Sequence, residues 1–86
     1  MKDLEKQFKA LANRRRLAIL KFLKGTKEAT VTNIADHIKL SIRSTSKHLA
    51  VLSAQDVVDK EQRSLLVYYR IALSQKNIIA KILPHI

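Results

Sequence analysis

Hydrophobic and polar residues recur along the first half of the chain with the three- and four-residue spacing of amphipathic helices. A first helix is predicted over about residues 3–12, and a second helix follows Asn13, whose side chain can cap it. The second helix is apolar on nearly all sides, which predicts a central place in the core, and we expect it to end at Gly25. The apolar positions of the first helix are Leu4, Phe8 and Leu11.

Two further short helices are predicted, and only a few residues separate them. Thr30 or Thr32 can cap the third helix, and Ser41 can cap the fourth, which we expect over residues 41–55. Two short helices joined by three or four residues are the outline of a helix-turn-helix. The positions of the fourth helix that we expect to face the core are Ile42, Thr45, Leu49 and Leu52.

After residue 55 the pattern changes to that of β-structure. Residues 57–58 and 65–71 are rich in β-branched and aromatic side chains, and the charged stretch 59–64 separates them. This pattern predicts a β-hairpin with a polar tip. Because the charged stretch contains no glycine, we expect a loop longer than a tight two-residue turn.

A last short helix is predicted over about residues 75–83, where Ser74 can cap it and Pro84 prevents its continuation. No repeat, linker or low-complexity tract divides the chain, so residues 1–86 are expected to form a single domain. The predicted fold class is mainly α with a small β-hairpin (α+β), in the order α-α-α-α-β-β-α.

The composition removes several classes of function. The chain has no cysteine, one glycine and three scattered histidines, which argues against disulfides, thiolate metal sites and glycine-rich phosphate loops. We therefore expect no enzyme, no cofactor and no metal. The longest apolar run, Leu65 to Tyr69, is far shorter than the roughly 18 residues of a membrane span. With no apolar signal region at the N-terminus, the expected location is the cytoplasm, in association with the nucleoid.

Charge then points to a class of partner. The sequence has 17 lysines and arginines against 7 acidic residues, a formal net charge of +10. Nucleic acid is the leading partner, because neutralising phosphates releases counterions. A solvated lysine-rich surface and an anionic membrane surface are the alternatives that charge alone leaves open.

Three stretches resemble winged-helix repressors of the arsenical-resistance (ArsR-like) type. They are FKALANRRRLAILKFL at 8–23, LSIRSTSKHLAVL at 40–52 and VYYRI at 67–71, in the order and at the spacing of that family. The first is similar to the opening helix pair, the second to the recognition helix and the third to the second wing strand. The resemblance implies a winged helix-turn-helix regulator of transcription, most simply a repressor, whose first and last helices pair in a homodimer.

The chain also departs from that family. Thr30 and Thr32 stand where metal-sensing members carry cysteines, and the predicted last helix offers no carboxylate or imidazole. Hydroxyls are poor ligands for soft metals, so we expect no metal sensing of the known types, and the effector is unknown. Arg14–Arg16 replaces the usual Pro-Thr-Arg, while Lys39 and Ser64 replace common glycines.

The expected partner is double-stranded DNA, with helix 41–55 in the major groove and the wing, residues 59–66, near the minor groove. Arg43 is expected to read guanine and Lys47 to contact phosphate. A polar, solvated face is the alternative for these side chains. The candidate DNA-binding residues are Ser41, Arg43, Ser44, Ser46, Lys47, Lys60 and Arg63.

The terminal helices, about 3–12 and 75–83, carry more apolar surface than one small domain needs, so we expect them to form the dimer interface. The alternative is that the last helix folds back onto its own domain. Two other functions stay open: an architectural nucleic-acid-binding protein without sequence preference, and a winged-helix module that binds another protein. The candidate interface residues are Leu4, Phe8, Leu11, Ile78, Ile79, Ile82 and Leu83.

Overall fold

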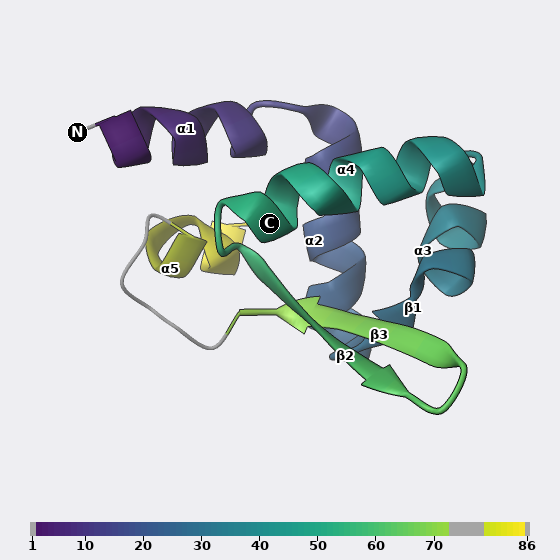
Figure 1. The fold of residues 1–86 in the computed structure, drawn as a ribbon. Coiled ribbons are helices and arrows are strands. Elements are labelled where there is room, and N and C mark those ends of the chain that lie inside the picture. Colours follow the sequence, from purple (N-terminus) through teal and green to yellow (C-terminus); the bar gives the residue numbers. More distant parts are fainter. Residues whose placement is uncertain (1, 73–78, 86) are drawn as a thin grey trace.

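The computed structural model of the chain describes residues 2–72 and 79–85 (Figure 1). Four helices and a three-stranded antiparallel sheet form a winged helix-turn-helix, in the order α-α-β-α-α-β-β. A short helical turn, α5, follows near the C-terminus. The elements are α1 (Lys2–Leu11), α2 (Arg14–Thr26), β1 (Ala29–Thr30), α3 (Val31–Ile38), α4 (Ile42–Ala54), β2 (Val58–Arg63), β3 (Leu66–Ile71), α5 (Ile79–Ile82) and the 3-10 helix η1 (Leu83–His85).

Polar caps begin three of the helices, as the sequence predicts. The Asn13 side chain accepts hydrogen bonds from the backbone amides of Arg15 and Arg16 at the start of α2, at 2.9 and 3.1 Å. Thr30, not Thr32, caps α3. The Ser41 hydroxyl accepts a hydrogen bond from the backbone amide of Ser44 at the start of α4. Each cap satisfies an amide that has no partner within its helix, which fixes where the helix begins.

Helix α2 continues through Gly25 to Thr26, so the predicted stop at Gly25 is wrong. The residue that ends the helix is Lys27, which has φ 74° and whose amide bonds to the carbonyl of Leu23. Lys39 ends α3 in the same way, with φ 58°. Lysine therefore occupies two positive-φ positions for which glycine is the usual choice.

The wing is a regular hairpin rather than two strands joined by a charged loop. Strand β2 contains most of the charged stretch and pairs with β3 from Val58↔Ile71 to Arg63↔Leu66. The turn consists of two residues, Ser64 and Leu65, and Ser64 supplies the positive φ of 57° that glycine would otherwise provide. The predicted longer loop is therefore wrong. Charged residues suit β2 because it is the outer strand of the sheet.

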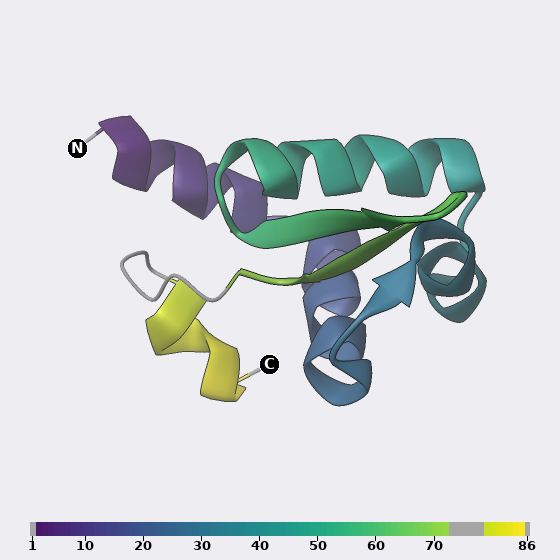
Figure 2. The same ribbon diagram turned by 60° about the horizontal axis from the view of Figure 1, so that its bottom comes forward.

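Strand β1 is not predicted from the sequence; its two residues pair with Tyr68 and Tyr69 of β3 and complete the sheet order β1-β3-β2. So short a strand carries no periodic pattern of its own. Figures 1 and 2 show α4 crossing α2, with the turn of the hairpin at the same end of the molecule as the start of α4. The fold thus places the start of α4 and the turn of the hairpin at one end of the molecule.

The core lies between α2, α3, α4 and the sheet, and it is formed mainly by aliphatic side chains. Thr45 is fully buried among them, as predicted. Ile42 is not: the structure leaves it 52% exposed, so its predicted inward position is wrong. It lies at the first turn of α4, where the helix extends past the edge of the core. The largest fully buried side chains are Ile19, Leu20, Leu23, Ile34, Leu49, Leu52, Val57, Val58 and Thr45.

Only the last part of the predicted C-terminal helix lies among the residues that the structure describes. Of the expected range 75–83, residues 75–78 lie outside the described residues, and α5 covers Ile79–Ile82 before η1 begins. Pro84 lies within η1, in agreement with its predicted role in stopping the helix. Within the described ranges, no helix has the length and apolar character needed to cross a bilayer.

Candidate nucleic-acid interface

Helix α4 presents a basic face that points away from the core. Arg43 and Lys47 lie one helical turn apart and are exposed, as is Ser46 beside them. The opposite side of the helix is fixed in the core by Thr45, whose burial leaves the helix little freedom to rotate. Within residues 4–72, no carboxylate forms a salt bridge with either cation.

The serines of α4 occupy different positions. Ser41 is exposed and is committed through its hydroxyl to capping the helix, whereas Ser44 is half-buried and offers its amide to that cap. Ser46 is exposed, so its hydroxyl faces outward together with the two cations. The N-terminal turns of α4 therefore place a helix N-terminus, one exposed hydroxyl-bearing residue (Ser46) and two positive charges on one surface.

Arg63 differs most from its predicted surroundings, because carboxylates surround its guanidinium. Its two terminal nitrogens donate to the carboxylate of Glu28, at 2.6 and 2.8 Å, and one of them also donates to Glu61 at 3.0 Å. The guanidinium carbon lies 4.6 Å from the centre of the Tyr68 ring. Arg70 donates to the same oxygen of Glu61 at 2.9 Å. The two arginines and two glutamates thus form a network that is neutral overall.

This network holds the pKa of the Glu28 carboxyl below its usual range, chiefly through the hydrogen bonds from Arg63. The pKa of Glu61 is lowered in the same way, by Arg63 first and then by Arg70. In turn, the two carboxylates raise the pKa of Arg63. Arg63 is therefore a charged but neutralised group, and it ties the end of β2 to the segment before β1.

Lys60 and Arg63, the two candidate DNA-binding residues of the wing, do not lie beside each other. They are three residues apart in β2, so their side chains leave opposite faces of the hairpin. Lys60 lies opposite Tyr69, which packs against the core, while Arg63 shares the outer face with Glu61 and Tyr68. Lys60 is exposed and, within residues 4–72, forms no salt bridge.

A second arginine that the sequence left unassigned connects α2 with two other helices. Nε of Arg16 donates to the carbonyl of Ala10 at 2.5 Å, Nη2 donates to the carbonyl of Lys9 at 3.1 Å, and Nη1 lies 3.2 Å from Nδ1 of His48 on α4. His48 is therefore a partly buried histidine whose ring is hydrogen-bonded within the fold. The run of three arginines gave no signal that one of them is structural.

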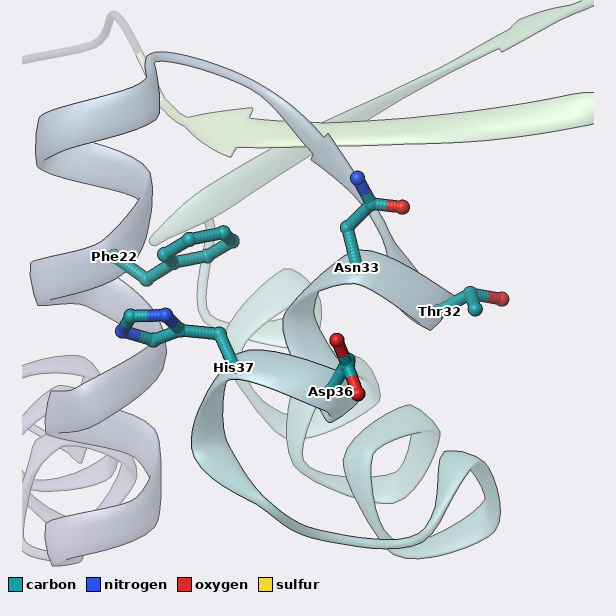
Figure 3. A pocket seen from close by; sticks show the side chains of 5 residues that line it. All are labelled: Phe22, Thr32, Asn33, Asp36 and His37. Atoms are coloured by element: carbon teal, nitrogen blue, oxygen red, sulfur yellow. The ribbon is translucent and has the colours of Figure 1, made fainter.

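Two aromatic rings stack between α2 and α3 (Figure 3), and both rings line each of two surface hollows. The rings of Phe22 and His37 lie 4.2 Å apart between centroids and 19° from parallel. A hollow of about 420 Å³ on one side is lined also by Thr32, Asn33 and Asp36. The other, of about 550 Å³, includes Arg15, Lys21 and Ile38 in its lining. Among the described residues, no three His, Cys, Asp or Glu side chains gather closely enough to hold a metal ion.

The predicted dimer residues fall into three groups. Phe8 is 51% exposed and Leu4 is half-buried, so α1 does present apolar surface. Leu11, however, is only 6% exposed and belongs to the core of its own chain, so it offers little accessible surface to a second copy. Ile82 also packs against that core. Ile78 and the side chains of Ile79 and Leu83 lie outside what the structure describes.

Comparison with known proteins agrees with this architecture. A family model described as a helix-turn-helix domain matches residues 11–61. The chain is 36% identical over 62 residues to the transcriptional repressor SdpR of Bacillus subtilis. The aligned region covers 72% of this chain and 68% of SdpR. It is 41% identical over 62 residues to the cadmium resistance transcriptional regulatory protein CadC of Listeria innocua, covering 72% of this chain and 52% of CadC. The chain thus spans about two thirds of SdpR and about half of CadC.

Among solved structures, the chain is similar to Mb0332 of Mycobacterium bovis, described as a homodimeric winged helix-turn-helix DNA-binding domain and a possible ArsR-family transcriptional regulator. The TM-score is 0.84 at 30% sequence identity, and the alignment covers 98% of this chain and 74% of that chain. The similarity therefore extends over the helices, the sheet and the wing together.

Proposed function

Because this chain belongs to the ArsR family of winged helix-turn-helix transcriptional regulators, which bind DNA and are not enzymes, we propose that it is a homodimeric repressor of transcription. It binds an operator of two half-sites and blocks access to the promoter. The observation that carries this proposal is the outward face of α4, where Arg43 and Lys47 are exposed on a helix whose other side is fixed in the core.

In the proposed complex the first turns of α4 enter the major groove. Arg43 donates two hydrogen bonds to a guanine, and the hydroxyls of Ser44 and Ser46 bond to bases or phosphates. Lys47 contacts phosphate, and the amide of Ser41 faces a phosphate at the helix end. The two kinds of contact have different roles: base contacts determine the preferred DNA sequence, and phosphate contacts fix the position of the protein on the duplex.

We place the wing near the adjacent minor groove, which is favoured because its turn lies at the same end of the molecule as the start of α4 (Figures 1 and 2). Lys60 offers an exposed cation on one face of the hairpin. Arg63 contributes only when phosphate competes with Glu28 and Glu61 for its guanidinium, so its share of the binding energy is smaller than that of Arg43.

We place the dimer interface on the apolar surface of α1, where Leu4 and Phe8 are accessible, together with the C-terminal helix. The relative Mb0332, described as homodimeric, supports a dimer but does not locate its interface. A two-fold axis there presents two α4 helices to half-sites about one DNA turn apart, roughly 34–36 Å. The proposed regulator is not a metal sensor of the known types, because the start of α3 supplies the hydroxyls of Thr30 and Thr32, which are poor ligands for soft metals.

The test is selection of bound DNA from a random duplex pool at about 150–200 mM salt, where purely electrostatic binding is already weak. An enriched two-fold motif with half-sites about 10 base pairs apart is the expected result. Retention of DNA without an enriched motif would identify an architectural protein, which the net charge of +10 would also serve. No retention by folded protein would redirect the search to a protein partner.

A further inference from the structure

The most informative unexplained side chain on the proposed DNA-binding face is Ile42. It is the first residue of α4 and is 52% exposed, although isoleucine is among the residues most often buried. Other large hydrophobic residues are exposed elsewhere, on α1, at the wing tip and in the second half of α4. Ile42 alone among them stands at the end of α4 that begins the predicted major-groove contact.

The neighbours of Ile42 define the chemistry of this surface. Residues four apart on a helix lie side by side, so Ile42, Ser46 and Ala50 form one exposed row. Arg43 and Lys47 form the next row. The surface therefore consists of a branched apolar group, then a hydroxyl and a methyl group, bordered along its length by two cations.

The edges of DNA bases offer one apolar group of matching kind. In the major groove, the 5-methyl group of thymine is the only hydrocarbon that a base presents, and aliphatic side chains recognise it by contact. The phosphates on either side of the groove match the cations of the neighbouring row. A second copy of this chain matches less well, because Arg43 and Lys47 of each copy would then face each other.

We infer that Ile42 is a specificity-determining residue that packs against the 5-methyl group of a thymine, next to the base that Arg43 reads. This inference rests on the proposed function, because it needs α4 in the major groove. The contact gives each half-site a thymine preference that hydrogen bonding alone does not supply. The apolar residue at the start of α4 is thereby part of the reading surface rather than a defect in the core.

The experiment removes the methyl group from the DNA and the side chain from the protein separately. Each thymine of the selected operator is replaced in turn by deoxyuridine, which deletes the 5-methyl group and leaves the base pair intact. At the contacted position, the replacement is expected to raise the Kd of the unaltered protein about fourfold per half-site. This is the loss of affinity expected when one carbon atom is no longer buried in the contact. For Ile42→Ala the same replacement is expected to have almost no effect, since the two changes remove one interaction.

Val51→Ala is the matched control, because Val51 is 39% exposed on the same helix but lies more than two turns away from Ile42. That variant should keep the full sensitivity to deoxyuridine. Thermal unfolding and sedimentation of Ile42→Ala check that fold and oligomeric state are unchanged. A change in its oligomeric state would assign Ile42 to a protein interface and overturn the inference.

The outcomes separate the two proposals. If selection yields a two-fold motif and no deoxyuridine position distinguishes the unaltered protein from Ile42→Ala, the inference is wrong and the proposed repressor function stands. If selection yields no motif at all, the proposed function fails and the inference fails with it. A position at which only the unaltered protein and Val51→Ala detect the missing methyl group supports both.

Discussion

Arg16 of α2 bonds to His48 of α4, with Nη1 of the arginine 3.2 Å from Nδ1 of the histidine. Arginine has only donors, so Nδ1 accepts and the neutral imidazole carries its proton on Nε2. The same guanidinium donates to the backbone carbonyls of Lys9 and Ala10. These carbonyls lie in the last turn of α1, where they have no hydrogen-bond partner within the helix. One side chain therefore joins the helix proposed for dimerisation to the helix proposed for DNA recognition.

Replacing Arg16 by alanine should lower the free energy of unfolding by about 1–3 kcal/mol, because two carbonyls and an imidazole lose a charged donor together. Arg16→Lys should recover only part of this loss, since a single ammonium cannot reproduce the geometry of the guanidinium. Arg14→Ala is the control, because Arg14 is exposed and its loss should change stability by less than about 0.5 kcal/mol. Urea unfolding measures all three, and equal effects at Arg14 and Arg16 would contradict the structural role.

The same contact predicts a dependence of stability on pH. Partial burial lowers the pKa of His48 below its usual value near 6.5, and the charges of Arg16 and Arg15 lower it further. Above that value the histidine is neutral in both the folded and the unfolded chain. As the pH falls below it, the unfolded chain takes up a proton more readily than the folded one, so stability decreases until the lowered pKa of the folded state is passed.

The measurement is the free energy of unfolding between about pH 7.5 and 5, for the unaltered protein and for His48→Gln. In His48→Gln, the free energy of unfolding should fall less on acidification than it does in the unaltered protein. The control is His37→Gln, because His37 lies on α3, and this variant should show the same fall as the unaltered protein. Identical profiles for the unaltered protein and His48→Gln would exclude a contribution from this histidine.

Local patterns were sufficient for the elements whose ends are set by nearby residues. Asn13 and Ser41 each cap the helix that follows within three residues, so the sequence contains the whole interaction. The recognition helix was predicted over 41–55 and is observed over Ile42–Ala54 for this reason. The apolar spacing of Thr45, Leu49 and Leu52 likewise repeats within one helix and predicted its buried side.

Long-range contacts decided what local patterns could not. Arg63 is neutralised by Glu28 from 35 residues away, and Arg16 meets His48 across 32 residues, so neither role has a local signal. The composition of the charged stretch in β2 predicts a loop because charged residues disfavour strands, yet pairing with β3 outweighs that preference. Ile42 was assigned to the core by periodicity, which does not show where the core ends.

Thr45 provides a test of core energetics. Its hydroxyl oxygen is buried and, within the described part of the chain, has no hydrogen-bond partner. Thr45→Val keeps the branched shape and removes this unsatisfied group, so we expect the free energy of unfolding to rise by about 1 kcal/mol. Thr32→Val, at an exposed position of α3, is the matched control and should change stability little. A loss of stability in Thr45→Val, measured by urea unfolding, would show that the hydroxyl is satisfied after all.

The wing network predicts that removing one carboxylate strengthens DNA binding. Glu28 accepts two of the three hydrogen bonds that bind Arg63 to carboxylates, so Glu28→Gln should leave its guanidinium available to phosphate. We expect tighter binding and a salt dependence of the binding constant that is steeper by about one unit per protomer. The measurement is a salt titration of affinity for the selected operator.

Glu5→Gln is the matched control, because it makes the same change in net charge and frees Lys9 on α1, far along the chain from the wing. Comparing the two variants separates a contact at the wing from a general gain of positive charge. The double variant Glu28→Gln/Arg63→Ala should lose the increase in DNA affinity, since the guanidinium that Glu28→Gln makes available is then absent. If Glu28→Gln binds DNA no more tightly than Glu5→Gln, or if the double variant keeps the gain, Arg63 does not contact DNA. Lys60 would then be the proposed cation that the wing contributes.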